Sequence, residues 1–126
     1  MRAVDTNLLV RLLTRDDAAL LARAETFIKS GAWVSHVVLV KTIWVLDSVY
    51  DRTAVQLANA VERLLDHKQL AIQDADVVSA ALVQFRARPA IGFSDCLVLE
   101  IARKAGHVPL GTFDKMLAKL DGAQLT

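Results

Sequence analysis

The segment that decides the fold is RAVDTNLLVRLL, residues 2–13, in which a short apolar run ends in an acid and a helical pattern follows. The run before Asp5 is too short for a helix and suits a strand. Leucines then recur at the spacing of one helix face, at Leu8, Leu9, Leu12 and Leu13. The segment therefore predicts a strand that leads directly into a helix.

The same change from a short apolar run to a helical pattern recurs along the chain. Further strands are predicted at residues 32–35, 70–72 and 108–110, and the helices that alternate with them at residues 16–30, 37–50, 53–68, 74–88 and 94–105. Parallel neighbouring strands need a crossover, usually a helix. The alternation therefore predicts an α/β class, in one layered domain over residues 1–126.

Several boundaries and side-chain positions follow from local chemistry. Thr53 and Gln56 form a capping-box pattern, and Ser94 is predicted to cap the last long helix. The segment 37–50 is so apolar that we expect a largely buried helix. Trp33 and Trp44 fall in apolar patterns and are expected to pack, in the core or at a subunit interface.

Composition excludes several classes of protein. Hydrophobic residues make up 54% of the 126 residues and charged residues 23%, which is a globular balance. The net charge of +1 does not indicate a polyanion-binding protein by bulk electrostatics. No apolar stretch reaches the roughly 20 residues that a membrane span needs, and charges interrupt the amino-terminal leucines. Together with the single Cys96, these features predict a cytoplasmic protein.

Three acids are placed where ligands gather in a parallel sheet. Asp5 and Asp114 follow predicted strands, and Asp95 begins a helix after Ser94. Because ligands bind at the carboxyl ends of strands, all three acids could face one rim and would need a cation to offset their charges. A hard divalent ion is the natural candidate. The alternative is structural: each acid taken singly suits a helix cap or the start of a helix.

The other reactive residue types give no comparable pattern. Cys96 lies beside Asp95, and a neighbouring anion would raise the pKa of its thiol, so we interpret it as a core residue. The histidines lack metal-ligand spacing and are interpreted as structural, namely His36, His67 and His107.

Three motifs, in this order, resemble those of a known family. They are VDTNLLVR at residues 4–11, FSDCL at residues 93–97 and GTFDK at residues 111–115. Together with the α/β alternation they resemble the PIN-domain ribonucleases, specifically the VapC-type toxins of bacterial toxin-antitoxin pairs. The likeness covers nearly the whole chain.

The resemblance implies a PIN-like three-layer α/β/α sandwich with a short-stranded central parallel sheet, and metal-dependent hydrolysis of RNA. It implies that Asp5, Asp95 and Asp114 hold Mg²⁺ or Mn²⁺. Supporting roles in orienting acids, water or phosphate would belong to Thr6, Asn7, Ser94 and Thr112. Candidates for the RNA backbone are Arg11, Arg15 and Lys115, with Arg103 and Lys104 as further basic residues.

One position departs from the family pattern. The helix after the second strand usually supplies a glutamate to the acidic site, and here the residue in that context is Lys41. An ammonium would weaken the binding of a divalent ion, unless the lysine simply extends its charge out of an apolar helix. We expect Lys41 to reach Asp5 or Asp95, to form an ion pair there, and to leave the chain weakly active or inactive.

The resemblance therefore implies an endoribonuclease toxin that acts with a VapB-like antitoxin and forms a homodimer, and we expect its activity to be reduced or lost because of Lys41. The alternative is a non-catalytic PIN module that binds an antitoxin or RNA. The sequence does not indicate which RNA is cleaved or whether one or two ions bind.

Overall fold

The structure, a computed structural model, describes residues 1–126 and has the α/β character that the sequence predicts. The chain divides into two compact units, Met1–Ala75 and Asp76–Thr126, and each is described by itself. No helix of the chain has the length and apolar character that crossing a membrane requires.

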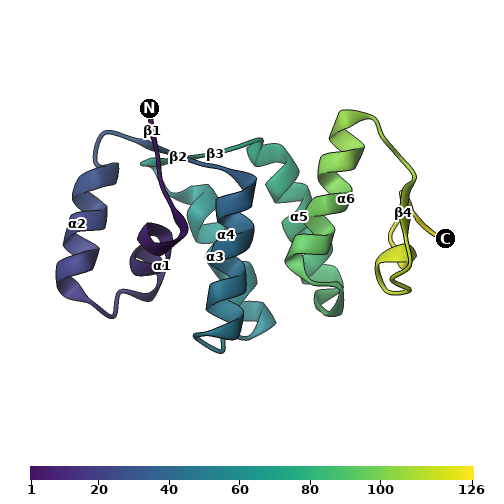
Figure 1. Cartoon of the computed structure of the whole chain (residues 1–126), viewed down its shortest axis with the longest axis horizontal. Helices are drawn as coiled ribbons and strands as arrows, with labels where there is room; N and C mark the ends of the chain where they lie inside the picture. Colours follow the sequence, from purple (N-terminus) through teal and green to yellow (C-terminus); the bar gives the residue numbers. More distant parts are fainter. The chain divides into compact units, whose positions relative to one another are not determined.

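The first unit holds a three-stranded parallel sheet in the order β1-β2-β3 (Figure 1). Its register pairs Arg2 with Ala32 and Ala32 with Leu70. The strands are β1 (Arg2–Ala3), β2 (Ala32–Val34) and β3 (Leu70–Ile72). The helices between them are α1 (Thr6–Thr14), α2 (Ala18–Ile28), α3 (His36–Ser48) and α4 (Ala54–Asp66).

The core of this unit forms where α1 packs against α2 and α3, and α3 packs against α4. Leu9 and Val61 are 0% exposed, and Leu39 is 1% exposed. Leu9 and Val61 come from the apolar faces that the sequence spacing predicts for their helices, and Leu39 lies in the apolar segment 37–50. Burying such side chains contributes about 1.5–3 kcal/mol each relative to exposure, so these contacts hold the ends of β1 and α1 in place.

The second unit contains a pair of helices, which lie side by side in Figure 1, and a two-stranded parallel sheet. The elements are α5 (Ala75–Ala87), the 3₁₀-helix η1 (Pro89–Ile91), α6 (Phe93–Ala105), β4 (Leu110–Thr112), the 3₁₀-helix η2 (Leu117–Lys119) and β5 (Ala123–Leu125). The buried rings of Phe85 and Phe93 meet edge to face at 6.1 Å. At the other end of the helix pair, Lys104 Nζ lies 2.8 Å from the Asp76 carboxylate. These two contacts show that α5 and α6 run antiparallel.

Local signals in the sequence place most of the helix ends correctly. Thr53 and Gln56 form the reciprocal capping box at the start of α4. Gly106 ends α6 with a φ of 83°, a conformation that glycine adopts without steric cost. Strand β4 begins at Leu110, two residues later than the expected start at Val108. The amide of Leu110 donates to Gly122, whereas Pro109 has no N–H to donate.

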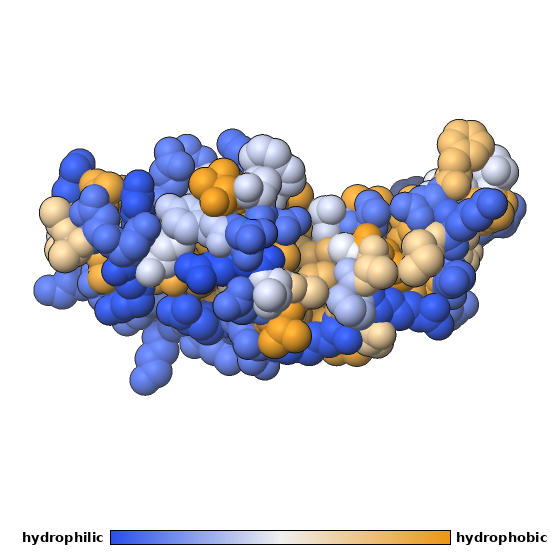
Figure 2. Space-filling view, turned by 90° about the horizontal axis from the view of Figure 1, so that it is seen from below, coloured by the Kyte–Doolittle hydropathy of each residue, from blue (hydrophilic) through white to orange (hydrophobic).

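Three expectations about individual residues are wrong. Ser94 does not cap α6, because Gly92 occupies the N-cap with a φ of 90° and the helix begins at Phe93. Helix α3 is not largely buried: Trp44 is 65% exposed and Val37 is 69% exposed. Trp33 is also 40% exposed, so neither tryptophan packs fully into a core. Figure 2 shows one face of the chain, on which hydrophobic residues lie in separate groups among hydrophilic ones.

Candidate active site

Asp5 lies where β1 leads into α1 and serves as the N-cap of that helix. Its Oδ1 accepts a hydrogen bond from the Thr6 amide at 2.7 Å. The structural interpretation of Asp5 as a cap is therefore confirmed. Because the side chain itself is exposed and Oδ2 makes no hydrogen bond, the second oxygen remains available to a ligand.

The residues that follow Asp5 differ in their surroundings. Thr6 is buried, and its Oγ1 is the one buried side-chain polar atom without a hydrogen-bond partner. Asn7 is exposed and lines a hollow of about 630 Å³ between α1 and α2, together with Arg11. Arg11 forms an ion pair with Asp16 at 3.2 Å, whereas Arg15 is exposed.

A hydrogen-bonded connection at the neighbouring strand ends joins His36, which the sequence indicated only as a structural residue, to Gln73. The His36 amide donates to Gln73 Oε1 at 2.9 Å, and His36 Nε2 lies 2.7 Å from the Gln73 carbonyl oxygen. Because a carbonyl oxygen only accepts, Nε2 carries the proton. These bonds join the residues after β2 to those after β3. Their position at the carboxyl ends of strands was the signal that could have identified them.

Lys41 lies in α3 with an exposed side chain. No ion pair joins Lys41 to Asp5 within the first unit, so that part of the expected pairing is wrong. The lysine extends into solvent, as in the alternative interpretation. The residue still places a cation on a helix that packs against α1.

In the second unit, Asp95 lies in the first turn of α6 and is partly buried. Its carboxylate makes no hydrogen bond. Burial raises the pKa of this carboxyl, and the nearby charge of Asp114 raises it further. Ionising the Asp95 carboxyl therefore costs more free energy in the folded unit than in water.

Asp114 is held firmly by the backbone that follows β4. Its amide donates to Thr112 Oγ1 at 3.0 Å, and its Oδ1 accepts from the amides of Met116 and Leu117 at 2.8 and 3.2 Å. The Thr112 hydroxyl therefore helps to hold the turn that carries Asp114. As in Asp5, one carboxylate oxygen is fixed by the backbone and the other is available. Lys115, the next residue, is exposed.

Asp95 and Asp114 form the pair of interacting carboxylates in this unit. Neither carboxylate forms an ion pair, the hydrogen bonds of Asp114 come from neutral backbone amides, and the two charges oppose each other. Oxygen ligands of this kind fit a hard divalent cation such as Mg²⁺ or Mn²⁺, which would remove the repulsion. The structure shows no group of three or more His, Cys, Asp or Glu side chains arranged to hold a metal ion.

Two basic residues that were candidates for RNA contacts are engaged elsewhere in the unit. Arg103 Nε donates to both carboxylate oxygens of the buried Glu100, at 3.1 and 3.2 Å, and its guanidinium also donates to the backbone oxygen of Asp121. Lys104 pairs with Asp76. Both side chains thus connect elements of the second unit.

Cys96 is 0% exposed and is a core residue, as predicted. Burial, then the charges of Asp95 and Glu100, raise the pKa of its thiol to about 11. The thiol is therefore neutral at physiological pH and is no candidate nucleophile.

The fold and these residues define a class: an α/β protein in which Asp5 and Asp114 follow parallel strands and the charges of Asp95 and Asp114 oppose each other. A family model described as PIN domain matches residues 2–123, and the chain belongs to the PIN domain family. PIN domains are generally metal-dependent nucleases. No curated protein and no solved structure matches the chain.

Proposed function

We propose that this PIN domain is the toxin of a type II toxin-antitoxin pair, a metal-dependent endoribonuclease that hydrolyses RNA phosphodiesters. The observation that carries the proposal is the pair of Asp95 and Asp114, whose charges repel each other without a cationic partner. A structural acid pair would be expected to have a neutralising side chain or a protonated member joined by a hydrogen bond.

The proposed metal ligands are Asp95 and Asp114, with Asp5 as the third ligand on the strength of its motif. Mg²⁺ or Mn²⁺ would supply a water of lowered pKa and offset the charge on the phosphoryl oxygens. Thr112 holds the turn of Asp114 through its hydroxyl, and Thr6 holds one oxygen of Asp5 through its amide.

The remaining roles rest on the family resemblance. Asn7 and Ser94 are exposed and free to orient water or phosphate. RNA phosphates would be contacted by Arg11, Arg15 and Lys115. Arg11 would have to leave Asp16 for this, and an ion pair as exposed as this one adds little to stability.

Lys41 gives this chain reduced or lost activity in our proposal. A lysine in place of glutamate changes the local charge by two units and removes an oxygen ligand. The exposed ammonium has no carboxylate partner within its unit, so its charge is uncompensated there. By the family resemblance, this charge would take the place of a carboxylate that helps to bind the divalent ion.

The partners are a small VapB-like antitoxin and a second copy of the chain, acting in the cytoplasm. Helix α3 supports an interaction surface, because Val37 and Trp44 expose large apolar side chains on it.

Lys41 also favours a second candidate function, a non-catalytic PIN module that binds an antitoxin or RNA. In that case, Asp95 and Asp114 would have no catalytic role, and Lys41 would be part of the surface that binds the partner. The two candidates differ in what restoring a glutamate does.

The test compares the wild-type chain with Lys41→Glu and two controls. Lys41→Gln removes the charge without adding a ligand, and Lys68→Glu makes the same charge change at an exposed residue after α4. Melting temperature is measured against Mn²⁺ concentration, and cleavage is measured on single-stranded RNA. Lys41→Glu should bind Mn²⁺ at least tenfold more tightly and gain cleavage, with a smaller gain in Lys41→Gln and none in Lys68→Glu. If neither binding nor cleavage improves in Lys41→Glu, the account of Lys41 as the cause of weak activity is wrong. If neither wild type nor Lys41→Glu binds Mn²⁺ or cleaves RNA, the nuclease proposal is wrong.

A further inference from the structure

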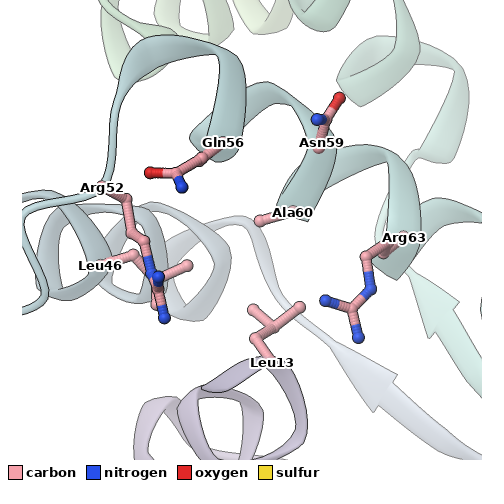
Figure 3. A pocket seen from close by; sticks show the side chains of 7 residues that line it. All are labelled: Leu13, Leu46, Arg52, Gln56, Asn59, Ala60 and Arg63. Atoms are coloured by element: carbon pink, nitrogen blue, oxygen red, sulfur yellow. The ribbon is translucent and has the colours of Figure 1, made fainter. Parts of the chain in front are cut away.

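A second site of different chemistry lies in the first unit, in a cavity of about 240 Å³ among α1, α3 and α4 (Figure 3). Leu13 and Leu46 come from α1 and α3, and Arg52 from the loop between α3 and α4. Helix α4 contributes Gln56, Asn59, Ala60 and Arg63. This cavity is separate from Asp5: eight residues of α1 at 1.5 Å each place Leu13 about 12 Å along the helix from that acid.

Two arginines bring their charges into this cavity without an acid to neutralise them. Figure 3 shows the guanidinium groups of Arg52 and Arg63 entering from opposite sides, over Leu13. No Asp or Glu lines the cavity, and neither arginine makes an ion pair. Elsewhere in the chain, Arg11 and Arg103 do pair with carboxylates. Arg52 has one ring contact, its Cζ lying 6.0 Å from the centre of the Tyr50 ring.

Backbone structure fixes the positions from which Arg52 and Arg63 extend into the cavity. Asp51 adopts a φ of 53°, and the next amide, that of Arg52, donates to the Leu46 carbonyl oxygen at 3.0 Å. This bond closes the end of α3 and fixes where Arg52 starts. Gln56 and Arg63 lie seven positions apart on α4 and so share a face.

Gln56 adds a neutral donor to the two cations. Its Oε1 accepts the Thr53 amide at 2.9 Å in the capping box, and this bond orients the side chain. The Nε2 group of Gln56 keeps its two hydrogens for another partner. The arginines and this amide together offer only donors to a ligand.

The floor of the cavity is apolar. Leu46 is 2% exposed and Ala60 is 8% exposed, and neither can solvate an ion. A charge interaction above such a floor is screened less than one in open water. An anion that bridges the two guanidiniums would therefore gain more than it would from two separate surface arginines.

We propose that this cavity binds a phosphate group between Arg52 and Arg63. Guanidinium groups match phosphate oxygens through pairs of parallel hydrogen bonds, and a tetrahedral phosphate presents acceptors to several donors at once. The phosphate can come from a free ligand, inorganic phosphate or a mononucleotide, or from the backbone of bound RNA. The inference goes beyond the proposed nuclease activity, since it uses none of the acids.

A purely structural role for the arginines makes a different prediction. The carboxyl-terminal ends of α1 and α3 favour nearby cations, so the arginines could simply stabilise the fold. In that case, their removal would lower the melting temperature and leave any response to phosphate unchanged.

The experiment uses the full chain in EDTA, so that the acid pair holds no metal. Inorganic phosphate and 5′-AMP are titrated by NMR chemical shifts and by melting temperature at constant ionic strength. The variants are Arg52→Gln with Arg63→Gln, and separately Gln56→Glu. Gln56→Glu retains a capping box, because glutamate serves at that position, while placing a competing carboxylate in the cavity. Arg23→Gln is the matched control, since Arg23 is outside this cavity.

We expect wild type and Arg23→Gln to bind both ligands, and the double arginine variant and Gln56→Glu to bind at least tenfold more weakly. A labelled single-stranded RNA separates the sources. Each neutralised phosphate contributes about 0.7 to the slope of log K against log salt. Because Arg52 and Arg63 contact the same phosphate, RNA as the source predicts a decrease of about 0.7 in the double variant. An unchanged slope with lost phosphate binding assigns the site to a free ligand. Absence of phosphate binding by wild type, or equal binding by the folded double variant, overturns the proposal.

Discussion

Asp114 acts on Asp95 from the turn after β4, and its charge adds to burial in raising the pKa of the Asp95 carboxyl. The proton is therefore held more tightly by Asp95 in the folded chain than in the unfolded one. Asp95 favours folding below its unfolded pKa, and this contribution is lost as the pH rises through the raised folded value. At neutral pH, the ionised Asp95 carboxylate therefore destabilises the folded chain.

The first prediction is that Asp95→Asn melts at a higher temperature than wild type at pH 7. The amide has nearly the same size and carries no charge, so it removes both the desolvation cost and the repulsion. The difference should shrink as the pH falls, because the raised pKa lets the wild-type Asp95 carboxyl take up its proton earlier in the folded chain than in the unfolded one. Calorimetry at pH 7 and below measures it, with Asp47→Asn on the exposed side of α3 as the control. A lower midpoint for Asp95→Asn at pH 7 would contradict the assignment.

A second prediction concerns Asp114→Asn, which removes the neighbouring charge and keeps the turn. Asparagine can still accept the Met116 and Leu117 amides through its side-chain oxygen. The pKa of Asp95 should fall toward its ordinary value without reaching it, because burial remains the larger cause. NMR titration of the Asp95 carboxyl carbon follows this directly. No change in that titration would mean that the two carboxylates do not interact.

Features that depend on a few neighbouring residues could be predicted from the sequence. The capping box of Thr53 and Gln56 is one, because both of its hydrogen bonds lie within four residues. Asp5 is another: its position directly after a strand identified it as a cap and as a candidate ligand. The α/β class followed in the same way from short apolar runs alternating with helical patterns.

Features that depend on contacts between residues distant in the sequence could not be predicted. Strand β5 exists through its pairing with β4, and its three residues carry no periodicity of their own. Trp44 shows the same limit, because its apolar surroundings in sequence do not reveal that its side chain is 65% exposed. Ser94 had the right chemistry for a cap, but Gly92 precedes it in the conformation that starts the helix. The bond between His36 and Gln73 joins residues that only the sheet brings together.

A third prediction concerns Cys96, whose thiol is buried and has its pKa raised to about 11. A thiol reagent should therefore modify the folded chain slowly at pH 8, at least a hundredfold more slowly than the chain unfolded in guanidinium. Asp95→Asn should lower the pKa of the thiol only slightly, since burial is the larger cause. Rapid labelling of the folded chain at pH 8 would show that the core around α6 opens readily.

The fourth prediction separates two roles of Asp5, as a helix cap and as a carboxylate. Replacing an N-cap aspartate by alanine costs about 1 kcal/mol, so Asp5→Ala should lower the free energy of unfolding by about that amount. Asparagine caps a helix as well as aspartate does, so Asp5→Asn should change the free energy of unfolding by only about a few tenths of a kcal/mol. In a chain that carries Lys41→Glu, both variants should lose at least tenfold in Mn²⁺-dependent RNA cleavage. Denaturant unfolding and cleavage rates measure the two effects. Asp17→Ala, at the N-cap of α2, is the matched control and should lose stability alone. If Asp5→Asn cleaves RNA as fast as its parent, capping is the whole role of Asp5.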